Sequence, residues 1–222
     1  MSLGLLGKKL GMTHVYDTAT CKATPVTVVD VSDIQIVQVK TADKDGYTAV
    51  QVGVTDKSPK RVNKASAGHF AKNGAEPKYS IREFRVEESE VLPSGTKLGA
   101  DQFAKDQWVD VIGVTKGRGF AGVVKRYRFK GQRQTHGSMM HRRTGAIGCR
   151  LTPGRVWKNQ KMPGHMGVDN RTVQNLQIVA ARTEDSILFI SGSIPGPKGG
   201  LVIVRPAKKK PAPVAAAAPE AK

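Results

Sequence analysis

The sequence predicts a mainly β protein, a small closed barrel with a small helical insertion and a long, extended basic loop. Short β-branched segments of alternating polarity recur on both sides of residues 113–167. Within residues 113–167 glycine and proline interrupt every apolar run, so the period of neither a helix nor a strand survives. Because strands are expected on both sides, this segment is an insertion into one sheet system.

The expected strands come directly from these alternating segments. They cover residues 23–30, 34–40, 47–54, 79–86 and 108–114 before the insertion, and 172–181, 186–191 and 200–204 after it. Residues 3–16 suggest two more short strands separated by a turn. One helix is expected near residues 59–72, with Ser58 as its N-cap and Pro59 at its first position. Many short strands with so little helix are typical of a small barrel.

Three regions follow from this assignment. The barrel body comprises residues 1–112 and 168–206, and the arm comprises residues 113–167. Residues 207–222 form a low-complexity tail rich in Ala, Pro and Lys, which we expect to be mobile.

Charge is distributed unevenly between these regions. The 222 residues carry a net charge of +18, yet residues 111–168 hold thirteen Lys or Arg and no Asp or Glu. The remaining residues hold 23 basic and 18 acidic side chains. Because the arm supplies no acids, its counter-charge is expected to come from nucleic-acid phosphate. We expect the arm of the free protein to be disordered and to order on that contact.

The candidate RNA-binding residues are mostly the cations and histidines of the arm. Two roles are open for Trp157, stacking on an unpaired base or packing against the body. Lys8 and Lys9 belong either to a solvated turn or to a second contact with the RNA backbone. The full set is Lys8, Lys9, Lys116, Arg118, Lys125, Arg126, Arg128, Lys130, Arg133, His136, His141, Arg142, Arg143, Arg150, Arg155, Trp157, Lys158, Lys161 and His165.

Other classes of function fit less well. His136 and His141 suggest a ribonuclease pair, but the arm has no carboxylate to orient a general base. With Cys149 they offer only three zinc ligands at irregular spacing. Cys21 and Cys149 indicate neither a disulfide framework nor a structural zinc site. There is no membrane-span or signal-peptide pattern, and the arm lacks the amphipathic period of a membrane-surface segment. We therefore expect a cytosolic protein without a metal or cofactor.

Several motifs resemble one known family in the same order. They are Leu6-Gly-Lys-Lys-Leu-Gly-Met-Thr13, Gly113-Val-Thr-Lys-Gly-Arg-Gly-Phe-Ala-Gly122, Thr135-His-Gly137, Thr152-Pro-Gly-Arg-Val156, Lys161-Met-Pro-Gly-His-Met-Gly167 and Arg171-Thr-Val173. Together they resemble the ribosomal protein L-three family of the large subunit, in its bacterial type, over residues 1 to about 206.

The resemblance implies a barrel of the translation-protein type on the surface of the large ribosomal subunit. It implies direct binding of large-subunit ribosomal RNA, a part in early assembly, and a loop that reaches toward the peptidyl-transferase centre. The loop tip falls at residues 130–136, with Gln132, Arg133 and Gln134 near that centre. Gln132 matches a glutamine that is methylated in some bacterial members.

The implied role is that of a structural constituent of the cytoplasmic ribosome, with no enzyme activity. The implied partners are ribosomal RNA and neighbouring large-subunit proteins, with no membrane, cofactor or small-molecule substrate. The alternative is a free, ribonuclease-like RNA-binding enzyme that uses His136 and His141.

Overall fold

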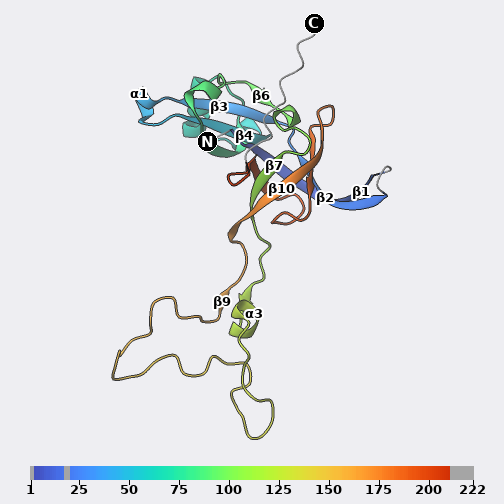
Figure 1. Ribbon diagram of the computed structural model, residues 1–222. Helices are drawn as coiled ribbons and strands as arrows, with labels where there is room; N and C mark the ends of the chain where they lie inside the picture. Colours follow the sequence, from blue (N-terminus) through green and yellow to red (C-terminus); the bar gives the residue numbers. More distant parts are fainter. Residues whose placement is uncertain (1–2, 18–20, 211–222) are drawn as a thin grey trace. The chain divides into compact units, whose positions relative to one another are not determined.

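The computed structural model describes residues 3–17 and 21–210. This part of the chain is mainly β, as Figure 1 shows, and the predicted class is confirmed. The chain divides into two compact units. One comprises Met1–Val114 with Asn170–Lys222 and is called the body below; the other, Thr115–Asp169, is called the arm.

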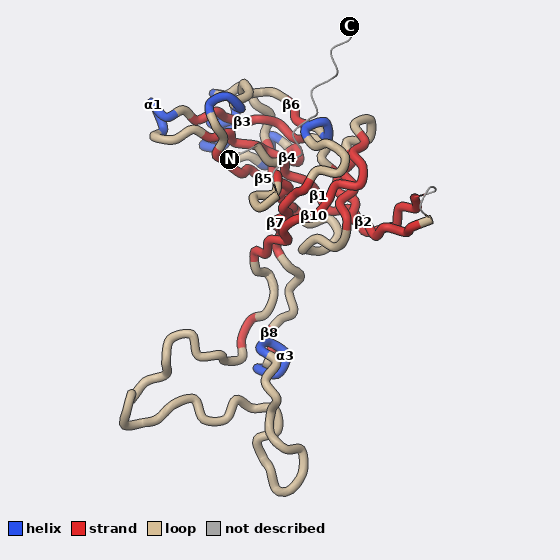
Figure 2. The backbone as a smooth tube through the Cα atoms, in the orientation of Figure 1, coloured by secondary structure: helices blue, strands red, loops and turns tan. Residues whose placement is uncertain are grey.

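Six antiparallel strands of the body form a closed barrel. Each strand pairs with two neighbours in the order β1-β12-β7-β10-β11-β2, and β2 pairs in turn with β1. Figure 2 shows these strands in red. Their bounds are Leu5–Asp17 for β1, Lys22–Asp30 for β2, Trp108–Val114 for β7, Asn170–Arg182 for β10, Ile187–Ser191 for β11 and Leu201–Pro206 for β12.

The barrel is filled by alternate residues of its strands. Val204 lies opposite Leu5 on one side and Val111 on the other. All three side chains are 0% exposed, as are Val29 and Ile178. Burying each such side chain contributes roughly 1.5–3 kcal/mol, so the apolar alternation holds the barrel together.

A four-stranded sheet adjoins the barrel in the order β5-β4-β3-β6. Its inner residues, among them Ile36 and Val52, belong to the same hydrophobic cluster as the barrel residues Leu5 and Val29. One continuous core therefore serves the whole body. The bounds here are Ile34–Lys40 for β3, Ala49–Asp56 for β4, Lys78–Arg85 for β5, Lys97–Leu98 for β6, Ala42–Asp45 for α1, Pro59–Arg61 for η1, Lys64–Lys72 for α2, Glu88–Glu90 for η2 and Ala100–Gln102 for η3.

The amino-terminal segment differs from the expected pair of strands. It is one strand of 13 residues, β1, whose register shifts between Lys9 and Gly11. The extra residue is absorbed as a bulge, and pairing with β2 continues on both sides of it. Lys9 N also donates to Gly200 O at 2.9 Å, and this hydrogen bond holds the chain extended where a turn was expected.

The predicted helix begins later than expected. Residues Pro59–Arg61 form a single 3-10 turn, and the α-helix α2 starts only at Lys64. The Ser58 side chain makes no capping hydrogen bond, whereas the Asn63 side chain accepts one from Ser66 N at 2.8 Å. Ser58 as the helix N-cap was therefore wrong. Phe70, 4% exposed, is the residue that fixes α2 to the body.

This correction yields a stability prediction. Asn63→Ala removes the cap of α2 and is expected to cost about 1 kcal/mol, a fall in melting temperature of roughly 2–4 °C for a body of this size. Ser58→Ala is the matched control, because it removes the residue that the sequence favoured, and its melting temperature should stay within a degree or so of the parent. Thermal unfolding followed by circular dichroism measures both. An equal loss in the two variants would show that Asn63 is not the cap.

The predicted tail begins too early, because residues 207–210 belong to the body. Ala207 is 7% exposed and donates its N–H to Trp108 O. The buried carboxylate of Asp110 accepts from Lys208 N at 3.3 Å and from Asn175 N at 3.1 Å. The remainder of the predicted tail, residues 211–222, lies outside the described residues.

Candidate nucleic-acid interface

Both roots of the arm leave from neighbouring strands. Val114, the last residue of β7, lies opposite Asn170, the first residue of β10. The pairing continues into the arm, since Thr115 N donates to Asp169 O at 3.0 Å. The arm is therefore a long insertion at the end of an ordinary hairpin.

The first part of the arm is a hydrogen-bonded neck, formed by residues 115–121 and 164–169. Arg118 N donates to Met166 O at 2.8 Å, and Met166 N donates to Gly119 O at 3.0 Å. The two-residue strands β8 (Phe120–Ala121) and β9 (Gly164–His165) then pair with each other. Backbone hydrogen bonds therefore pair the two sides of the neck, although no apolar periodicity marks this pairing in the sequence.

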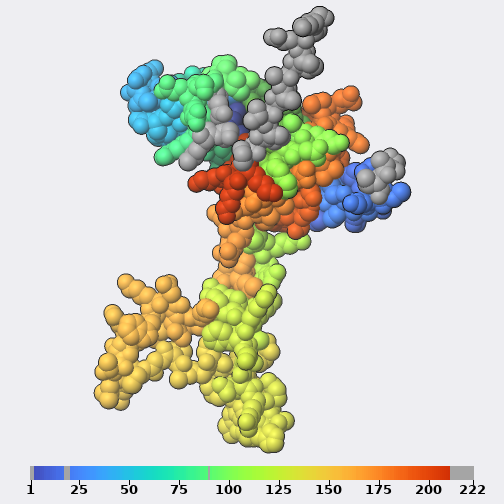
Figure 3. Space-filling model, in the orientation of Figure 1, coloured from blue at the N-terminus to red at the C-terminus, as the bar shows by residue number. Residues whose placement is uncertain are grey.

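Beyond the neck lies the short helix α3 (Val123–Tyr127). Arg126 Nη1 donates to Met162 O at 2.8 Å, and the guanidinium lies 5.0 Å from the centroid of the Tyr127 ring. Ala121 and Val123, each 2% exposed, are the buried apolar residues of the arm. With so small a core, the arm separates into two loops coloured yellow-green and gold in Figure 3.

The predicted tip is a closed loop within the arm. Gln132 N donates to His141 O at 2.7 Å, and His141 Nδ1 lies 3.2 Å from Arg133 O. These contacts bring the two ends of residues 132–141 together. The side chains of Gln132, Arg133, Gln134 and His136 are all exposed.

In the part of the chain that the structure describes, no arm cation forms an ion pair with a carboxylate. The ion pairs that the structure shows among its described residues lie in the body: Lys40 with Glu83, Lys78 with Asp56, Arg182 with Asp185 and Arg205 with Asp110. Twelve of the thirteen arm cations are exposed, and Arg126 is half-buried. The charge of the arm is thus presented to the surroundings.

Trp157 and Lys9, both predicted to bind RNA, differ in their exposure. Trp157 is 58% exposed, with the Arg155 guanidinium 5.6 Å from its ring centroid, so its indole is accessible. Lys9, in contrast, is 8% exposed and donates from Nζ to Ile194 O at 2.9 Å and to Gly196 O at 3.2 Å. The prediction that Lys9 binds RNA was wrong, because its ammonium binds a loop of the body. Lys8 is exposed beside it.

In the described chain, neither His136 nor His141 has a hydrogen bond to a carboxylate, and no group of three or more His, Cys, Asp or Glu residues is placed to hold a metal ion.

Backbone N–H groups of Thr152, then of Leu151 and Arg150, hold the pKa of the exposed Cys149 thiol below its usual value.

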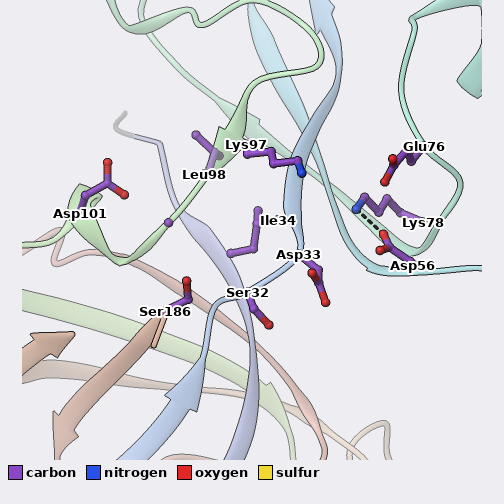
Figure 4. A pocket seen from close by; sticks show the side chains of 11 residues that line it. Ser32, Asp33, Ile34, Asp56, Glu76, Lys78, Lys97, Leu98, Asp101 and Ser186 are labelled. Atoms are coloured by element: carbon purple, nitrogen blue, oxygen red, sulfur yellow. Dashed lines mark hydrogen bonds and ion pairs between the residues drawn. The ribbon is translucent and has the colours of Figure 1, made fainter. Parts of the chain in front are cut away.

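The body contains a cavity of about 450 Å³ that includes none of the predicted site residues. Figure 4 shows its side chains, among them Asp33, Asp101 and the pair formed by Lys78 and Asp56. Because carboxylates outnumber ammonium groups in its lining, this cavity does not suit a phosphate.

No helix of the described residues is long and apolar enough to cross a membrane.

No sequence pattern marked the exposed apolar residues of the arm. Phe120 is 80% exposed, Met139 is 87% exposed and Leu151 is 88% exposed. None of the three belongs to an apolar run with the period of a helix or a strand, so no periodic pattern marks them. Their exposure means that the arm offers apolar as well as cationic contacts.

A β body joined to an arm of exposed cations, whose one acid is Asp169 at its root, defines a class, that of basic proteins whose exposed charge suits a polyanion. Comparison with known proteins narrows this class. The family model described as Ribosomal protein L3 matches residues 80–186.

Similar proteins match almost the whole chain. The large ribosomal subunit protein uL3 of Akkermansia muciniphila is 54% identical over 211 residues, which cover 95% of this chain and 100% of that protein. The proteins of the same name from Methylococcus capsulatus and Vibrio vulnificus are each 50% identical, and cover 95% and 93% of this chain and 100% and 99% of their own lengths. The chain belongs to the ribosomal protein L3 family.

Proposed function

We propose that this protein is a structural constituent of the large ribosomal subunit and binds large-subunit ribosomal RNA through its arm. The observation that carries the proposal is the set of thirteen arm cations that have no carboxylate partner among the described residues. Each phosphate contact releases condensed counterions, so many such contacts give strong, salt-dependent binding. The names of the similar proteins support the same assignment.

The role proposed for the arm is to neutralise and position RNA without making or breaking bonds. The six-stranded barrel, of the translation-protein type, would hold both roots of the arm and contact neighbouring large-subunit proteins. Binding of this kind favours a part in early assembly of the subunit, in the cytoplasm.

We propose further that the loop closed by Gln132 and His141 supports the RNA around the peptidyl-transferase centre. The backbone of Gln132 is held by His141 while its side chain is exposed. An amide presented in this way is open to methylation. Arg133 and Gln134 follow it on the same exposed loop.

The test compares two charge reversals of equal size. Arg133→Glu places a carboxylate where RNA phosphate is expected, whereas Lys60→Glu makes the same change on the exposed η1 turn of the body. Removing one phosphate contact lowers the salt slope by about 0.7–0.9, and the added repulsion weakens binding further. We expect Arg133→Glu to reduce mature large subunits in sucrose gradients and to slow peptide transfer, with Lys60→Glu close to the parent.

Two outcomes would contradict these proposals. Equal subunit profiles and growth for the two variants would remove the tip from the proposed interface. A parent protein that does not co-sediment with large subunits through a high-salt wash would contradict the proposed function itself.

A further inference from the structure

The arm contains a hollow that its charge does not explain. It has a volume of about 440 Å³ and lies where the chain leaves the neck, between the start of α3, the turn at residues 140–145 and the residue before β9. Val123, Met140 and Pro163 supply its apolar surface, and Arg142, Arg143 and Thr144 supply its polar groups.

We propose that this hollow binds a single unstacked base of ribosomal RNA, an inference that rests on the proposed function. A phosphate alone would use the N–H groups of Arg142 and Arg143 and would leave the apolar surface of Val123, Met140 and Pro163 without a partner. A base presents an apolar face to Val123 and Met140 and a polar edge to the Thr144 hydroxyl. Single-stranded RNA is commonly recognised through bases splayed out of the stack.

The two arginines at this hollow suit the same ligand. Arg142 and Arg143 are exposed, and neither is in an ion pair among the residues that the structure describes. A guanidinium plane stacks on a base and binds the attached phosphate, so one side-chain type serves both parts of a nucleotide. Methionine sulfur is polarizable and packs well against rings.

The walls of the hollow are fixed before any ligand arrives. Arg126 ties the segment before Pro163 to α3 through its 2.8 Å bond to Met162 O. Arg143 N donates to Met140 O at 2.8 Å and holds the turn. The pairing of β8 with β9 holds the two remaining ends. A preformed site loses less conformational entropy on binding, which favours a specific base.

A side chain from a neighbouring protein is the competing occupant. Basic side chains are disfavoured, because the lining has two guanidinium groups and no carboxylate. A nucleotide joins a flat apolar ring to a negative charge, and both features match this lining.

Two adjacent methionines make a matched experiment. A diazirine-bearing amino acid is placed at Met140, which lines the hollow, or at Met139, which is 87% exposed and does not line it. After assembly into large subunits and irradiation, position 140 is expected to give one strong reverse-transcription stop, at a single nucleotide. Position 139 should give weaker, scattered stops. Adducts from position 140 to protein, or the same scattered RNA pattern from both positions, would overturn the proposal.

A second measurement uses purified full-length protein and does not depend on assembly. The probes are a ten-nucleotide oligoadenylate and the same RNA with abasic sites, which carry equal charge. Base stacking on protein is worth about 1–3 kcal/mol per base, so loss of the bases should weaken binding of the parent by about tenfold or more. Met140→Gln should shrink that ratio at least about threefold, and Met139→Gln should leave it unchanged.

The two proposals fail separately in this experiment. Equal ratios for the two variants would refute the base site while salt-dependent RNA binding persists. Failure of either RNA to bind the parent at low salt would refute RNA binding by the arm as well.

Discussion

Replacing residues 116–168 by Asn-Gly is expected to leave a folded body that has lost nearly all of its affinity for large-subunit ribosomal RNA. Thr115 N and Asp169 O are already joined at 3.0 Å, the geometry that closes a two-residue hairpin. Asn-Gly is the favoured sequence for such a turn. The body should therefore keep its melting temperature within a few degrees.

The loss of RNA affinity follows from charge. The replaced segment carries thirteen Lys or Arg and no acid, so the net charge falls from +18 to +5. If about half of these cations contact phosphate, the parent should lose roughly a thousandfold in affinity between 50 and 200 mM salt. The shortened variant should lose less than about tenfold over the same range. Filter binding to deproteinised large-subunit RNA measures both slopes.

A charge-matched control separates the cations from the guanidinium group. Changing all eight arm Arg residues to Lys keeps the charge and should keep the salt slope, because the slope counts neutralised phosphates. A shortened variant with the salt slope of the parent would instead place the phosphate contacts on the body.

Many strands of the body could be predicted because neighbouring residues in the sequence determine where each strand begins and ends. The expected bounds of residues 34–40 and 108–114 coincide with β3 and β7, since β-branched alternation ends at turn residues on both sides. The start of α2 was missed because Ser58 and Asn63 are both good caps. Which of them begins the helix depends on where Phe70 must lie in the core, and that is a tertiary constraint.

The candidate site likewise combines features that the sequence predicts with features that depend on long-range contacts. The total charge of residues 111–168 and their lack of acids are properties of composition, and they pointed to a polyanion. The burial of Lys9 was not predictable, because its carbonyl partner Ile194 lies 185 residues further along the chain. The hollow beside Met140 joins three separated segments, so no local pattern marks it. Composition predicts the kind of ligand, whereas long-range contacts decide which residues meet it.

Gly167→Ala is expected to open the neck of the arm. Gly167 has φ +87°, a left-handed conformation that costs alanine about 1–2 kcal/mol. An added Cβ would also collide with the carbonyl oxygen of Lys116, and would lie 2.9 Å from Gly117 Cα and 3.1 Å from Arg118 N. These are backbone atoms of the opposite segment, so the collision is relieved only by separating the two sides of the neck.

Gly119→Ala isolates the effect of backbone conformation in the same neck. Gly119 has φ +67°, but a Cβ there meets nothing within 4 Å. It should therefore cost only the left-handed penalty and speed exchange of the neck amides by about tenfold. Gly167→Ala adds the collision and should speed exchange at Arg118 and Met166 by about thirtyfold or more, since 1.4 kcal/mol corresponds to tenfold.

Hydrogen exchange of the RNA-free protein measures this difference at the two amides that bridge the neck, Arg118 N to Met166 O and Met166 N to Gly119 O. Faster exchange in Gly167→Ala than in Gly119→Ala would show that Gly167 is required for the close approach of two backbone segments as well as for its dihedral angle. Equal exchange in the two variants would show that only the dihedral angle matters. A neck unprotected even in the parent would show that the arm gains its order, including these hydrogen bonds, only on RNA.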